Sequence, residues 1–178
     1  MKKRIIIFLC GCGIISFFYS QALALQERIS DLNASVEVAA VFGISLDNPH
    51  LAFGLIGPGK TKVLGEGHFF NEVKCRSNSG RSWYLKVSLV SLRLAEENYI
   101  LTAPHLKYKI VESTGQARTE KIDFKEFSEQ PILIYTSEGE DNRGQEVNLR
   151  FQYILSTPAD APAGNYVGQI IFTMSESP

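Results

Sequence analysis

The sequence predicts an all-β protein, an antiparallel β-sandwich of about eight strands in a single domain. Three observations support this fold class. Apolar and polar residues alternate with a period of two in several stretches, turn residues separate these stretches at short intervals, and helical periodicity is almost absent. The clearest stretch is residues 82–89, where Trp83, Leu85 and Val87 share one parity and polar residues occupy the other. One face of this strand is therefore expected in the core and the other in solvent.

The remaining strands follow from the same alternation and from the turns between them. A long first strand is expected at residues 34–46, because its even positions are apolar until Asp47-Asn48-Pro49 stops it. Residues 91–103 permit a helical turn or a long crossover, and a short strand is expected around Ile122 and Phe124. The other expected strands are 51–55, 69–75, 106–110, 131–135, 147–155 and 166–174.

The first residues have the layout of a secretory signal peptide. Basic residues 2–4 precede the apolar run 5–19, and Ala22-Leu23-Ala24 offers small residues before a cut. We predict cleavage after Ala24, which divides the chain into a signal peptide, residues 1–24, and one mature domain, residues 25–178. The alternative is a lipoprotein signal, because Cys12 follows a small residue. In both cases the protein is exported, and no transmembrane segment is expected in the mature chain.

The charge of the mature chain restricts its possible partners, and its cysteine content restricts its possible disulfides. Residues 1–24 hold three of the 18 basic and none of the 19 acidic residues, so the mature chain has a formal net charge of −4. This charge argues against nucleic acid and anionic membrane surfaces as partners. Cys75 is the sole cysteine after residue 24, so no intramolecular disulfide is expected. Its parity with Val73 predicts a buried, unreactive thiol.

One nucleotide-binding pattern is present and is expected to be inert. Residues 54–61 match G-x-x-x-x-G-K-[ST], whose mechanism needs a helix that begins at the lysine, here Lys60. The glycines at positions 65 and 67 do not sustain such a helix. The expected structure is a strand that ends in a turn at Pro58, without nucleotide.

No metal, cofactor or catalytic site is predicted. The three histidines have no second ligand at metal-binding spacing, and residues 138–142 lack the alternating oxygen ligands of a calcium loop. Those residues are expected to form a solvated hairpin tip. No nucleophile motif is present, so the protein is predicted not to be an enzyme, and an enzyme that acts on envelope glycan is only a third alternative.

Two segments carry a family resemblance. Trp83-Tyr84-Leu85 is a Trp-x-Leu triplet after a polar turn, and residues 163–178, with Phe172-Thr173-Met174 at the place of a second triplet, look like a closing strand. Together they resemble WxL domains, bacterial surface modules that are secreted, rich in β-structure and attached noncovalently to the cell wall. The resemblance implies cell-wall polysaccharide or other surface proteins as partners. It makes these six residues, 83–85 and 172–174, the candidate binding residues.

The same residues also have a purely structural interpretation. Trp83, Phe172 and Met174 are in phase with aliphatic neighbours, which is the usual position of core residues. In that case the triplets mark the fold, and Tyr84 and Thr173, on the opposite parity, are the exposed candidates.

A second family is also similar. Secreted pilin-like subunits of the spore-coat-U type contain Phe-Gly-x-x-x-Pro-Gly, as at residues 53–59, and end in Ala-Gly-x-Tyr-x-Gly, as at residues 163–168. This resemblance implies assembly by strand complementation, which requires an incomplete sandwich and an unpaired alternating segment. The overall prediction is an immunoglobulin-like sandwich in the cell envelope, in the periplasm or on the extracellular surface. Its predicted role is to bind wall glycan or to assemble with other surface proteins, with the pilin-like subunit as the alternative.

Overall fold

The structure is a computed structural model, and it describes residues 35–95, 98–117 and 123–178. The chain divides into an N-terminal unit, residues 1–37, and a folded unit, residues 38–178, to which the description below refers. The predicted signal peptide and its cleavage site lie outside the described residues. The folded unit contains ten strands and two short 3-10 helices in the described ranges, and all strand pairs are antiparallel. The all-β prediction is therefore confirmed.

The first sheet is built around the long strand β9 (Glu146–Ser156). The strand order is β1 (Phe42–Leu46), β3 (Asn71–Ser77), β9, β6 (Leu106–Ser113) and β7 (Lys125–Glu126). The short strand β2 (Thr61–Leu64) pairs with the second half of β9, beyond the part that pairs with β3. Residues of β9 alternate between buried and half-buried positions, as expected for a strand with one face on the core.

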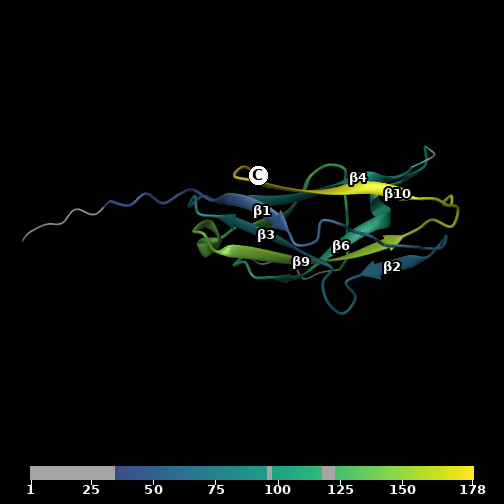
Figure 1. Ribbon diagram of the computed structural model, residues 1–178, viewed down its shortest axis with the longest axis horizontal. Helices are drawn as coiled ribbons and strands as arrows, with labels where there is room; N and C mark the ends of the chain where they lie inside the picture. Colours follow the sequence, from purple (N-terminus) through teal and green to yellow (C-terminus); the bar gives the residue numbers. More distant parts are fainter. Residues whose placement is uncertain (1–34, 96–97, 118–122) are drawn as a thin grey trace, which may run out of the picture. The chain divides into compact units, whose positions relative to one another are not determined.

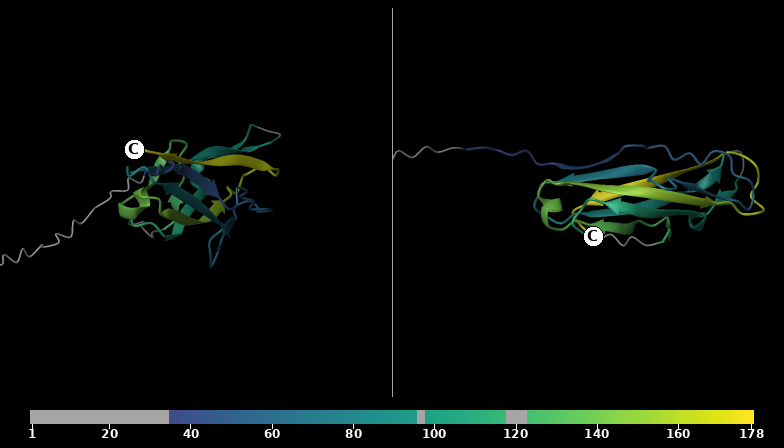
Figure 2. Two further views of the ribbon diagram at one scale, coloured as in Figure 1. Left: turned by 60° about the vertical axis from the view of Figure 1, so that its left-hand side comes forward. Right: turned by 90° about the horizontal axis from the view of Figure 1, so that it is seen from below.

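The second sheet is built around β4 (Tyr84–Leu94). Strand β10 (Tyr166–Ser175) pairs with β4 along most of its length. Strand β8 (Ile132–Thr136) pairs with the beginning of β4, and β5 (Ile100–Leu101) pairs with its end. Figure 1 shows β4 and β10 in a layer above β3 and β9, and Figure 2 shows the same layers from two other directions. The two 3-10 helices are η1 (Ala103–His105) and η2 (Gly139–Asn142).

One hydrophobic core lies between the sheets. The second sheet contributes Trp83, Leu85, Val87 and Leu89, and the first contributes alternate residues of β3, β6 and β9, among them Phe151. Trp83 and Leu85 are fully buried, which confirms the expected core face of this strand. In the described residues no helix has the length and apolar character needed to cross a membrane.

Several predicted elements were wrong in their extent. The first strand begins at Phe42 and not at residue 34, and residues 51–55 form no strand. Strand β1 ends because the Asp47 carboxylate accepts the Glu72 amide hydrogen at 2.7 Å and the chain then leaves the sheet at Pro49. Strand β2 was not predicted, and in place of a crossover at residues 91–103 the strand β4 continues to Leu94. The ten strands exceed the expected eight because three short strands, β2, β5 and β7, are added and the strand expected at residues 51–55 is lost.

Candidate functional site

One side of the two-sheet structure is open, between the edge strands β1 and β10. Strand β1 pairs with β3 alone and β10 pairs with β4 alone among the described strands. Each strand therefore keeps one backbone edge that no described strand covers. Such an edge presents free amide and carbonyl groups and is able to pair with a further strand.

The core-facing side chains of β1 are unusually exposed. Opposite residues of an antiparallel pair point to the same face, and Phe42, Ile44 and Leu46 lie opposite Ser77, Cys75 and Val73. These three partners in β3 are fully buried, whereas Phe42 is 45% exposed and Ile44 and Leu46 are each 38% exposed. The β1 side chains thus face the core side but are only partly covered.

Strand β10 has the same property on the other sheet. Its residues Ile170, Phe172 and Met174 lie opposite Leu89, Val87 and Leu85, all of which are buried. The three β10 side chains are only half-buried, although they pack against the core. The inward faces of both edge strands are therefore incompletely covered along the same side of the molecule.

A hollow follows this side. One part, of about 500 Å³, lies between the end of β1, the segment after it and residues 166–172 of β10. A second part, of about 700 Å³, lies between residues 51–58 and 161–166. The two parts share Leu51, Ala52, Phe53, Leu92 and Tyr166, so they adjoin. We call this continuous hollow the groove.

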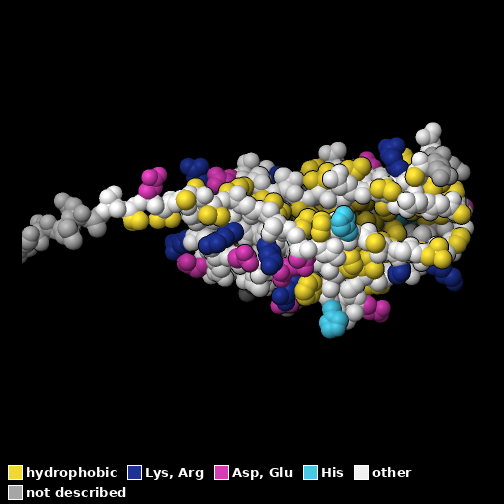
Figure 3. Space-filling model, viewed as in Figure 1, with side chains coloured by type: hydrophobic (Ala, Val, Ile, Leu, Met, Phe, Trp, Pro, Cys, Tyr) yellow, Lys and Arg dark blue, Asp and Glu magenta, His cyan; other side chains and the backbone are white. Residues whose placement is uncertain are grey.

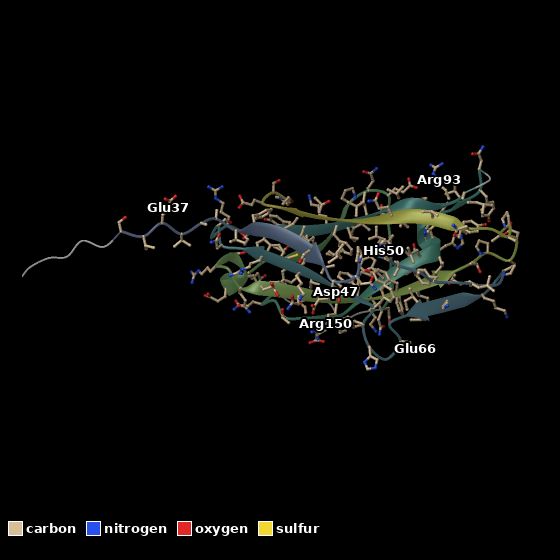
Figure 4. The ribbon with its side chains drawn as sticks, viewed as in Figure 1. Glu37, Asp47, His50, Glu66, Arg93 and Arg150 are labelled. Carbon is tan, nitrogen blue, oxygen red and sulfur yellow. The ribbon has the colours of Figure 1, made fainter. Side chains whose placement is uncertain are left out.

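The groove has no acidic, lysine or arginine side chain in its lining, where apolar side chains outweigh polar ones such as Asn48, Asn71 and Gln169. In Figure 3 hydrophobic side chains border the hollowed region on this face, and His50, which lines the groove and is labelled in Figure 4, lies among them. A ligand that suits this groove therefore presents an apolar face toward the core.

Residues 48–56 run along the groove without joining either sheet. The side chains of Leu51, Phe53 and Ile56 pack against the core, while Leu55 points into solvent. The segment is held by side-chain contacts, such as that of the Lys62 ammonium with the carbonyl of Phe53. It therefore covers part of the open core without supplying a strand to pair with β10.

The polar groups at the bottom of the groove already have partners. The Tyr153 hydroxyl donates to Asn71 Oδ1 at 2.9 Å, and Asn71 Nδ2 donates to the carbonyl of Asn48 at 3.4 Å. Burial raises the pKa of Tyr153 well above its usual value, so this hydroxyl stays protonated. The floor of the groove consequently has little spare hydrogen-bonding capacity for a polar ligand.

The end of the domain around Trp83 is closed. The indole Nε1 donates to the carbonyl of Asp141 at 3.2 Å, and the ring lies 5.3 Å from that of Tyr135. The Asp141 carboxylate accepts hydrogen bonds from the Tyr135 hydroxyl and from the amides of Gln116 and Glu138. Burial, and then the bond to Asp141, raise the pKa of Tyr135.

This closed end corrects one prediction. Residues 138–142 were expected to be a solvated hairpin tip. Residues 138–140 are exposed, but residues 139–142 form η2 and Asp141 is fully buried. The sequence signal was a capping box, because the side chains of Glu138 and Asp141 each accept the other residue's amide hydrogen. The sequence alone did not indicate that Asp141 turns inward to reach Trp83 and Tyr135.

The structure brings the two triplets side by side. In the register of β10 with β4, Met174 lies opposite Leu85, and Phe172 lies two residues further along. Trp83 and Leu85 are fully buried, and Phe172 and Met174 face the core. Thr173 is exposed and Tyr84 is half-buried on the outer face. The structural interpretation of Trp83 is therefore confirmed, and Tyr84 and Thr173 are the triplet residues that reach the outer surface.

Other predicted features are placed as follows. A strand, β2, and not a helix follows Lys60, so the nucleotide pattern lacks the context its mechanism needs. No group of three or more metal-ligating side chains occurs in the ranges that the structure describes. Cys75 is a buried free thiol, as predicted, and burial raises its pKa to about 12.

Comparison with family models and with curated proteins identifies no relative of this chain.

Proposed function

We propose that the protein is an exported structural subunit of the cell surface, an incomplete immunoglobulin-like sandwich that assembles by accepting an extended strand from another surface protein into its groove. The observation that carries this proposal is the half-exposed, core-facing row on both edge strands, together with an uncharged groove that adjoins Leu46 of β1 and Ile170 and Phe172 of β10. A strand added in this groove would cover the part of each row that lines it. This is the alternative function that the pilin-like resemblance implies.

The energetics favour a strand over other ligands. An inserted strand forms backbone hydrogen bonds along the free edge of β10 and buries every second side chain in the groove. Covering an exposed apolar side chain contributes about 1.5–3 kcal/mol, so several such residues offset the cost of ordering the strand. Because every second side chain of the strand would enter the groove and the others would face solvent, the inserted side chains would determine which strand binds.

Binding of wall glycan by the triplets has less support. A sugar needs exposed aromatic rings and free polar groups, whereas Trp83 and Leu85 are fully buried. Tyr84 and Thr173 remain possible contacts on the outer face, and they lie away from the groove. The absence of catalytic activity stays a prediction from the sequence.

A peptide-binding experiment tests the proposal. The probe is a labelled ten-residue peptide of alternating valine and threonine with terminal lysines, titrated against the mature chain by fluorescence anisotropy. Ala52→Arg places a charge at an exposed position that lines both parts of the groove. Leu133→Arg, at an exposed position outside the groove, is the matched control.

We expect saturable binding that Ala52→Arg weakens at least about tenfold, because the long charged side chain would compete with the peptide for the groove and lose hydration on insertion. The Leu133→Arg variant should bind like the parent. Absence of binding, or equal binding by both arginine variants, would contradict the proposed function.

A further inference from the structure

We infer that the free edge of β1 pairs with the same edge of a second copy of this chain, in an antiparallel two-fold dimer centred on Ile44. This contact lies beyond the proposed function, which uses the edge of β10 and the groove. It is indicated by a strand, β1, whose five residues are all exposed and uncharged and whose outer edge no described strand covers.

The hydrogen bonds to β3 show which backbone groups of β1 are free. In an antiparallel ladder, alternate residues direct both the amide and the carbonyl toward the neighbouring strand. The Asn78 amide donates to the carbonyl of Val41 at 3.1 Å. The Asp47 amide donates to the carbonyl of Glu72 at 3.2 Å, in the same unbroken register. The odd-numbered residues therefore bond to β3, and the even-numbered residues of β1 direct their amides and carbonyls to the open side.

The same even-numbered residues carry the apolar side chains. They are Phe42, Ile44 and Leu46, each between 38% and 45% exposed. When Ile44 of one copy lies opposite Ile44 of the other, Phe42 of each copy lies opposite Leu46 of its partner. All the free amides and carbonyls of β1 then find a partner, and the three apolar side chains of one copy cover those of the other.

No charge or bulky side chain blocks this approach. On the opposite face of the strand Gly43 of one copy meets Ser45 of the other, and a Cβ added at Gly43 would have nothing within 4 Å. The nearest acidic group, the Asp47 carboxylate, accepts the Glu72 amide hydrogen at 2.7 Å. An edge without charge, proline or bulge favours association with another strand.

The other end of the same sheet shows the contrast. The edge strand there, β7, consists of a lysine and a glutamate. Charged residues at an edge discourage association, so of these two edges only β1 is suited to pairing. The β1 contact uses the same surface on both copies and closes after two. It is smaller than a standard interface of about 1,600 Å², so the dimer should form reversibly as the protein concentration rises.

A charge-swap experiment tests the two-fold axis. Ile44→Lys and Ile44→Glu each place like charges opposite one another in the dimer. By sedimentation velocity of the mature chain, we expect each variant to raise the dimer Kd at least about tenfold, and their equimolar mixture to dimerise within about twofold of the parent. Ser45→Glu, on the other face of the same strand, is the matched control and should stay within about twofold of the parent.

Cysteine cross-linking tests the register with smaller changes. Opposite residues of a hydrogen-bonded pair have Cα atoms about 5.5 Å apart, which suits a disulfide, so Ile44→Cys should cross-link to itself under mild oxidation. Ser45→Cys should not, because it lies opposite Gly43, but it should cross-link to Gly43→Cys in a mixture. The buried Cys75 leaves the parent as the uncross-linked control on a non-reducing gel.

Three results would each overturn the inference. They are a parent that stays monomeric at every concentration, charge variants whose mixture dimerises no better than either alone, and equal self-cross-linking by Ile44→Cys and Ser45→Cys.

Peptide binding separates this dimer from the proposed function. Ile44 lines neither part of the groove, so Ile44→Lys should bind the alternating valine–threonine peptide like the parent. A chain that dimerises through β1 and binds no peptide would support the dimer and contradict the proposed function. A chain that binds the peptide and never dimerises would do the reverse.

Discussion

The end of the domain around Trp83 and the side along β10 are built from neighbouring parts of the same sheet, yet one is closed and the other is open. At the closed end the indole donates to the backbone carbonyl of Asp141 and the Tyr135 hydroxyl donates to the Asp141 carboxylate, and all three side chains are almost fully shielded from solvent. At the open side Phe172, which packs on the buried ring of Phe151 at 5.3 Å, remains half exposed.

The difference teaches that alternation of apolar residues does not by itself complete a core. A large ring with a paired donor and a buried carboxylate joins the two sheets at one end. Along β10 the half-buried row packs on core residues such as Phe151, and among the described residues no strand pairs with the outer edge of β10. Such an edge keeps unused pairing capacity.

The largest effect is expected at the closed end. Trp83→Ala removes a fully buried ring and its hydrogen bond to Asp141, and should lower the free energy of unfolding by about 3–5 kcal/mol. Urea denaturation of the mature protein measures this loss. A variant that unfolds at the same urea concentration as the parent would show that the ring does not hold this end together.

An intermediate effect is expected at the open side. Phe172→Ala should cost the monomer about 2 kcal/mol, because its ring is already partly in solvent, whereas Phe151→Ala should cost about 3–5 kcal/mol. Urea denaturation of both variants compares them directly. Equal losses at the two positions would remove the contrast between a closed and an open core.

Alkaline pH should destabilise the closed part of the core. The Cys75 thiol has a pKa of about 12 in the folded protein against 9.0 when it is not buried. Below pH 9 both states are protonated; above it only the unfolded state ionises, so stability is lost as the pH rises. One pH unit above 9.0 the loss is about 1.4 kcal/mol.

Cys75→Ala isolates this contribution. The variant has the same cavity at pH 7 and pH 10, so the difference between its unfolding free energies at the two pH values should be smaller than that of the parent. Tyr135 and Tyr153, whose pKa values are also raised by burial, contribute a loss that begins near pH 10 in both proteins. An identical pH dependence in parent and variant would mean that Cys75 ionises in the folded state.

The smallest effect is expected on the outer face. Tyr84→Ala should change the free energy of unfolding by no more than about 0.5 kcal/mol, because its side chain lies outside the core. Thermal melting measures this change, and retention on isolated envelope polysaccharide measures any glycan contact. Loss of retention in Tyr84→Ala, with unchanged melting and unchanged assembly, would favour wall binding through the outer face.

Most of the sheet structure could be predicted from the sequence. Period-two alternation located β3, β4, β6, β8, β9 and β10 to within a few residues, apart from the longer end of β4. It failed at residues 35–41 and 51–55, which have strand-like patterns but pair with no described strand. Alternation reports which residues favour a strand, while pairing depends on a neighbour that the sequence pattern does not identify.

The groove could not be predicted in the same way. Its two walls, residues 48–58 and 161–172, are more than a hundred residues apart, and their approach depends on the whole topology. The buried Asp141 was missed because an acidic loop usually indicates solvent exposure. The groove and the burial of Asp141 both depend on contacts between residues far apart in the sequence, which local patterns do not encode.

Hydrogen exchange along β10 tests the central claim most directly. In the mature protein without a ligand, the β10 amides that do not donate to β4 should exchange rapidly, because no described strand pairs with that edge. When the alternating valine–threonine peptide is bound, the same amides should become strongly protected. A peptide complex in which β10 exchanges as fast as in the free protein would contradict insertion of a strand into the groove.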